Sequence, residues 1–109
     1  MTAADTQPIF QALADPTRRW LIERLAQVES DTVSNLARQR PITRQAISKH
    51  FAILVEAGLV SSRQVGRERQ YSLKPEGLNQ ANDWIESIAS QWDRRLQRLQ
   101  DYLSEEEGD

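Results

Sequence analysis

The fold is decided by one stretch of the chain, VSNLARQRPITRQAISKHFAILVEAGLVSSRQVGRERQY, residues 33–71. Its apolar spacing indicates a short helix at 33–39, a tight turn and a second helix at 44–57. Two β-rich runs follow at 59–64 and 69–73, with Gly66 in the turn between them, where a positive φ is often required. The pattern predicts a helix-turn-helix followed by a hairpin with a basic tip.

The spacing within this stretch predicts how its two helices pack. Ala37 is small enough for a close helix crossing, and Ile47, ten residues later, is expected to fill the junction. Thr43 is expected to cap the second helix. This arrangement leaves the first turns of the second helix free to enter a DNA major groove.

Charge separates the middle of the chain from its flanks. Residues 32–74 carry eight Lys or Arg side chains and two acidic ones, a net of +6. Residues 1–31 carry a net of −2 and residues 75–109 a net of −6, so the whole chain has a formal charge of −2. The basic middle third therefore suits a polyanion, which the overall composition does not suggest.

The side chains on the expected exposed face suit base and phosphate contacts. Arginine can pair with guanine and glutamine with adenine in the major groove. The candidate DNA-contacting residues are Thr43, Arg44, Gln45, Ser48, Lys49 and, on the flank, His50, with Arg67 and Arg69 at the hairpin tip. Glu68 is expected to point away from DNA. The alternative is a solvated helix face and an ordinary charged turn.

The flanking segments predict a dimer. Helices are expected at 7–14 and, after Asp15-Pro16, at 16–28. The last helix, expected at 76–103, carries an apolar stripe and would be about 40 Å long, longer than the domain before it. A second copy of the chain is the simplest cover for that stripe. The candidate dimer-interface residues are Ile9, Phe10, Leu13, Ile85, Ile88, Trp92, Leu96 and Leu99.

The fold class is therefore mainly α with a small β-hairpin: a winged helix-turn-helix domain with a long C-terminal dimerisation helix. We expect residues 1–103 to form this one domain and residues 104–109 to be an acidic disordered tail.

Several function classes are not favoured. The 109 residues contain no cysteine, no apolar run of membrane-spanning length and no secretory leader, so we expect a cytoplasmic protein without disulfides. One histidine, no phosphate-binding glycine loop and no paired-carboxylate signature argue against an enzyme and against a cofactor.

These residues resemble the ArsR-type winged-helix transcriptional repressors, over nearly the whole chain. The resemblance rests on LADPTRRWLIERL, TRQAISKHFAILVEAGLV and VGRERQYSL. It implies a homodimer that binds an inverted repeat in double-stranded DNA. By position it makes Arg44, Gln45 and Ser48 base-reading residues, Lys49 and His50 backbone contacts, and Arg67 and Arg69 wing contacts.

Metal sensing, common in this family, is not expected here. Cysteine ligands are absent, and the single histidine lies in the recognition helix, so the chain is similar to a metal-free branch. The three tryptophans are expected to serve packing; an aromatic pocket for an apolar effector is the sharper alternative, and any small-molecule effector is unknown.

We predict a dimeric, sequence-specific DNA-binding regulator, most simply a repressor. The alternative is a winged helix that serves only as a protein-interaction module and does not bind DNA. The basic face favours DNA, because a protein-docking face more often exposes aromatic or aliphatic side chains.

Overall fold

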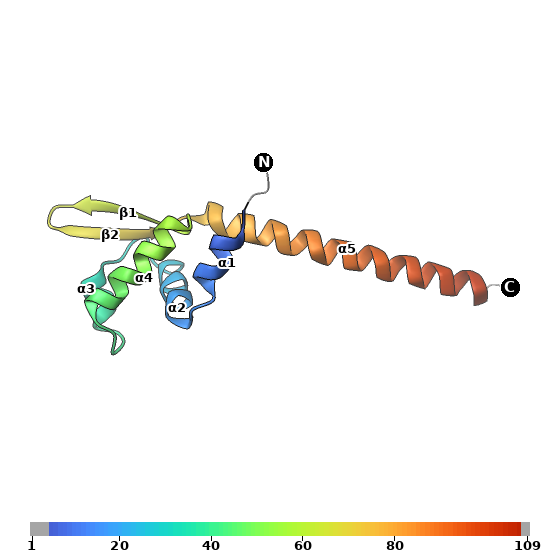
Figure 1. Cartoon of the computed structure of the whole chain (residues 1–109), viewed down its shortest axis with the longest axis horizontal. Coiled ribbons are helices and arrows are strands. Elements are labelled where there is room, and N and C mark those ends of the chain that lie inside the picture. The colour runs from blue at the N-terminus through green and yellow to red at the C-terminus, as the bar shows by residue number, and fades with distance from the viewer. Residues whose placement is uncertain (1–4, 108–109) are drawn as a thin grey trace.

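The computed structural model describes residues 5–107 and shows five helices and one two-stranded sheet in that range (Figure 1). The elements in chain order are α1 (Gln7–Leu13), α2 (Pro16–Leu25), α3 (Val33–Ala37), α4 (Arg44–Glu56), β1 (Val60–Val65), β2 (Glu68–Leu73) and α5 (Pro75–Glu107). The predicted fold class, a winged helix-turn-helix with a long last helix, is confirmed.

Local sequence signals account for the start of each central helix. Asp15 caps α2 by accepting hydrogen bonds from the amides of Thr17 and Arg18, at 2.8 and 3.1 Å. Thr43 caps α4, its hydroxyl oxygen accepting from the amide of Ala46 at 3.1 Å. Each cap satisfies amides that have no partner within the helix.

Two helices end earlier than the sequence predicts. α2 stops at Leu25 rather than at residue 28, and α3 stops at Ala37 rather than at residue 39. In both places the chain tightens into turns, with the amide of Gln27 bonded to the carbonyl of Arg24 and that of Gln39 to Leu36. Val28 still packs on the core, which explains why its spacing suggests a helix.

One core joins α1–α4, the hairpin and the start of α5. Phe51 and Tyr71 stack face to face at its centre, with ring centroids 4.0 Å apart. Ile47 is fully buried at the crossing of α3 and α4, as predicted, while Ala37 is half-buried there. The buried apolar residues are Ile9, Ala12, Leu21, Ile22, Leu25, Leu36, Ile47, Phe51, Leu54, Leu59, Val60, Tyr71 and Ala81.

The hairpin is antiparallel, with Val65 paired to Glu68 and only Gly66 and Arg67 between the strands. Gly66 has φ +62°, the conformation that two-residue hairpin turns need at their first position. Because side chains alternate along a strand, Glu68 points to the face opposite Arg69 and Tyr71.

The last helix is the dominant feature of the shape. α5 has 33 residues, about 50 Å at 1.5 Å per residue, and extends far beyond the rest of the chain (Figure 1). α1 lies beside its first turns, where Phe10 meets Trp84 edge-on at 5.4 Å. No helix within residues 5–107 is long and apolar enough to cross a membrane.

The end of α5 corrects the predicted boundary. The helix continues through residues 104–107, which were expected to be a disordered acidic tail. Those residues are one serine and three glutamates, and glutamate is a good helix former, so nothing stops the helix before Gly108. Residues 108 and 109 of the expected tail lie outside the described residues.

Candidate nucleic-acid interface

The first two turns of α4 form an exposed polar face. Arg44, Gln45, Ser48 and Lys49 are all exposed, whereas Ile47 between them is buried and holds the helix against the core. The face contains no large apolar side chain. Thr43, at the helix start, uses its oxygen as the cap and keeps its hydroxyl proton for an external acceptor.

The hairpin adds two arginines at the same end of the molecule. In Figure 1 the tip between β1 and β2 and the start of α4 both lie opposite the free end of α5. Arg67 is exposed in the turn. Arg69 lies on the hairpin face that carries Tyr71, and its Nη1 donates to Ser62 Oγ at 2.9 Å.

A groove joins the helix to the hairpin. Its volume is about 280 Å³, and it is lined by Ser48, Ala52, Val55, Glu56, Ser62 and Tyr71. Ser62, which holds Arg69, thus shares a groove with Ser48 of the predicted reading face. The structure therefore brings Ser48 and the Arg69 side of the hairpin to one surface, while Arg67 stands at the tip.

The basic residues of this surface keep their charge available. Within residues 5–107 the only ion pair joins Arg24 to the buried carboxylate of Asp31. Arg44, Lys49, Arg67 and Arg69 are therefore free of carboxylate partners in the described part of the chain. Unpaired cations on one surface favour a polyanionic partner.

His50 differs from the other predicted contacts. It is half-buried on the flank of α4, and its Nδ1 lies 3.3 Å from Nη1 of Arg18 on α2. The sequence predicts His50 at the interface but gives no sign of this neighbour, which lies 32 residues earlier.

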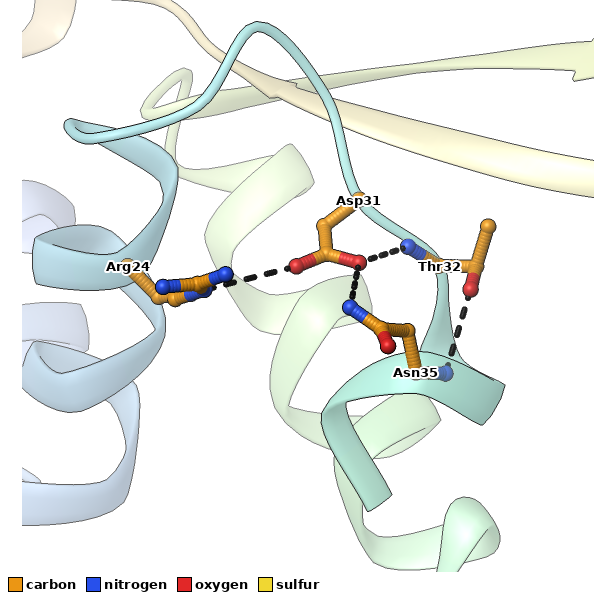
Figure 2. Close-up of polar contacts among 4 residues, drawn as sticks. All are labelled: Arg24, Asp31, Thr32 and Asn35. Carbon is orange, nitrogen blue, oxygen red and sulfur yellow. Dashed lines mark hydrogen bonds and ion pairs between the residues drawn. The ribbon is translucent and has the colours of Figure 1, made fainter. Parts of the chain in front are cut away.

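Asp31 is a structural anchor that the sequence does not reveal. Its setting in a polar link suggests an exposed side chain, yet the residue is only 7% exposed. Its Oδ1 accepts from the amide of Thr32 and from Nδ2 of Asn35, each at 2.8 Å, and its Oδ2 lies 3.6 Å from Nε of Arg24 (Figure 2). Its backbone also pairs with Tyr71 of β2 in both directions. The residue ties α2, α3 and the root of the hairpin together.

The predicted dimer residues fall into three groups by exposure. Ile9 is 2% exposed within its own chain, so the structure places it in the subunit core rather than at an interface. An apolar stripe on a short helix shows which side is buried but not which neighbour buries it. Phe10 and Leu13 are half-buried. The α5 residues of the set are exposed: Ile85, Ile88, Trp92, Leu96 and Leu99.

The predicted set contained no metal ligand. In the described part of the chain no three His, Cys, Asp or Glu side chains gather as metal ligands.

The fold and its exposed basic face define a winged helix-turn-helix protein. A family model described as a helix-turn-helix domain matches residues 13–63. An HTH-type transcriptional regulator of Mycobacterium tuberculosis is 48% identical over 69 residues, covering 63% of this chain and 64% of that protein. The transcriptional repressor SdpR of Bacillus subtilis is 30% identical over 88 residues, covering 81% of this chain and 97% of SdpR.

Solved structures agree with the sequence matches. An ArsR-like transcriptional regulator from Rhodococcus sp. RHA1 superimposes with a TM-score of 0.79 at 37% identity, covering 89% of this chain and 88% of that one. The chain belongs to the ArsR family of helix-turn-helix transcriptional regulators, a family of regulators rather than of enzymes.

Proposed function

We propose that the protein is a dimeric transcriptional repressor that binds an inverted-repeat operator in double-stranded DNA. The observation that carries the proposal is the exposed, unpaired and polar first half of α4 beside a basic hairpin, in a chain of this family. That SdpR is a repressor supports repression over activation.

In the proposed complex each α4 lies in a major groove. Arg44, Gln45 and Ser48 read base edges, since they project from the first two turns, which reach deepest into the groove. The remaining contacts are to the sugar-phosphate backbone and come from Thr43, Lys49, His50, Arg67 and Arg69. Such contacts fix the register of the protein on DNA without reading sequence.

The second subunit is proposed from the exposed stripe of α5. Ile88, Trp92 and Leu99 are 47%, 55% and 55% exposed, although they continue the apolar face that begins at buried Ala81. In the proposed dimer, Phe10 and Leu13 of α1 are covered by the second copy together with these residues. Two copies related by a two-fold axis match the symmetry of an inverted repeat.

A duplex selected from the source genome tests the function. We expect wild-type protein to bind the selected duplex at least ~10³-fold more tightly than a scrambled duplex of equal length, the range typical of specific binding. Equal affinity for the two duplexes would contradict sequence-specific binding. No binding to either duplex at low salt would contradict the proposal and favour a protein-interaction module.

We further propose that operator binding involves no metal effector. The chain has no cysteine, and its one histidine is directed at Arg18. We expect added zinc, or a chelator, to change operator affinity by less than about twofold. If the protein binds no metal, its affinity for DNA does not depend on the metal concentration. Zinc-dependent release from the operator would overturn this.

A further inference from the structure

Arg18 links three helices through one side chain. Its Nε donates to the carbonyl of Ala12 at 2.7 Å and its Nη2 to the carbonyl of Gln11 at 3.2 Å, both in the last turn of α1. Its Nη1 lies 3.3 Å from Nδ1 of His50 on α4. Carbonyls at a helix C-terminus lack partners within the helix, so they are natural acceptors for a guanidinium.

The start of α2 holds Arg18 in place. Its backbone amide donates to the carboxylate of Asp15, and this hydrogen bond, with a second from the amide of Thr17, lowers the pKa of Asp15. The side chain is thus fixed at its base by the Asp15 cap and at its tip by α1.

This contact determines which nitrogen of His50 carries the proton. A guanidinium has five N–H donors and no acceptor, so Nδ1 of His50 must be the acceptor. The neutral ring then carries its proton on Nε2, at the opposite edge. A hydrogen bond to one ring nitrogen commonly fixes the tautomer and orientation of a functional histidine.

We infer that Arg18, which lies on α2 outside the helix-turn-helix, is the positioning residue for DNA contact by His50. It holds the imidazole with Nε2–H ready to donate to a backbone phosphate oxygen. The same guanidinium donates hydrogen bonds to the last turn of α1, a helix proposed to lie at the dimer interface. The DNA contact of His50 therefore also depends on the position of α1. The inference rests on the proposed function.

Arg19 provides a matched control. Its Nη1 donates to the carbonyl of Leu13 at 2.8 Å, so it also ties α2 to the end of α1, but among the described residues its side chain has no hydrogen bond to His50. Arg18→Ala and Arg19→Ala each remove one positive charge and side-chain hydrogen bonding to the end of α1, two bonds for Arg18 and one for Arg19. Only Arg18→Ala also removes the histidine contact.

The first experiment measures the tautomer of the histidine directly. The chain has a single histidine, so ¹⁵N NMR of the imidazole reports His50 alone. At a pH where the ring is neutral, we expect the proton on Nε2 in wild type and in Arg19→Ala, and a mixture of tautomers in Arg18→Ala. A proton on Nδ1 in wild type would overturn the inference.

The second experiment is a double-mutant cycle on DNA affinity, with thermal unfolding and oligomeric mass checked for every variant. We expect His50→Ala and Arg18→Ala each to weaken binding to all duplexes about tenfold, the scale of one hydrogen bond to a charged group. The double variant should be no weaker than either single variant, while Arg19→Ala should stay within about twofold of wild type.

Each outcome separates this inference from the proposed function. Additive losses in the Arg18 and His50 variants, or equal losses in the Arg18 and Arg19 variants, would overturn the positioning role while operator binding by wild type stands. Failure of wild type to bind any duplex would instead contradict the proposed function, and the NMR result would still report on the Arg18 contact.

Discussion

Asp31 shows how much one buried side chain does in a domain this small. Its carboxylate satisfies the amide of Thr32 and the side chain of Asn35 and faces Arg24, while its backbone pairs with Tyr71. The cluster fixes the start of α3 and the root of the hairpin relative to α2 (Figure 2). Both elements position the predicted DNA face, so we expect the anchor to matter for DNA binding as well as for stability.

We expect Asp31→Ala to lower the free energy of unfolding by about 2–3 kcal/mol, because it leaves buried hydrogen-bonding groups without partners. Arg24 is 32% exposed and can turn to solvent, which limits the loss. Glu29→Ala, at an exposed position in the same link, is the control and should change stability by less than about 0.5 kcal/mol.

Urea unfolding at equal chain concentration measures both variants, since a dimer's stability depends on concentration. Equal stability of the Asp31 and Glu29 variants would contradict the anchoring role.

At the residue scale the sequence predicted what is decided locally. The Thr43 cap, buried Ile47 and the turn at Gly66 follow from neighbours within a few positions. Contacts between distant segments, such as Arg18 with His50, were missed because a single sequence does not show which segments meet. For the same reason Ile9 was assigned to a second subunit, whereas its own chain buries it.

At the scale of the element, α5 is the helix that leaves the most apolar surface uncovered within the chain. The helix and its apolar stripe were predicted from spacing, and only its C-terminal end was misplaced. Within the chain, the stripe is covered only near its start, where Ala81 is buried and Trp84 meets Phe10. Beyond Trp84 its large apolar side chains are about half exposed.

We expect Ile88→Glu combined with Trp92→Glu to convert the dimer to monomers or aggregates and to weaken operator binding, because the charges would face an apolar interface. Ser87→Glu with Ser90→Glu adds the same charge to the opposite side of the helix and should leave the dimer intact. Light scattering at micromolar concentration measures the mass. A monomeric wild type would show that the stripe has another role.

At the scale of the whole molecule, the two proposed surfaces lie at opposite ends. The chain measures 75 × 32 × 21 Å along its principal axes, with the basic surface at one end and free α5 at the other (Figure 1). The last turn of α1 and the middle of α4 are linked through Arg18, so one side chain joins the proposed pairing helix to the proposed DNA-contacting helix.

The recognition helix is proposed to read the sequence and the hairpin to clamp the backbone. Arg44 and Gln45 lie on exposed helical turns that fit a major groove, whereas Arg67 stands at the tip of a short hairpin that meets mostly the backbone. Substitutions in α4 should therefore reduce the preference for the operator sequence, whereas substitutions at the hairpin tip should reduce affinity for all duplexes.

The most direct test is a set of binding isotherms for wild type, Arg44→Ala, Gln45→Ala and Arg67→Ala on the selected and scrambled duplexes at several salt concentrations. We expect each α4 variant to lose roughly 1–3 kcal/mol on the selected duplex and little on the scrambled one. Arg67→Ala should weaken both duplexes alike and lower the salt slope by about one for each phosphate that a subunit no longer neutralises. Selective loss of the selected duplex in Arg67→Ala, with Arg44→Ala and Gln45→Ala unchanged, would contradict this division of roles.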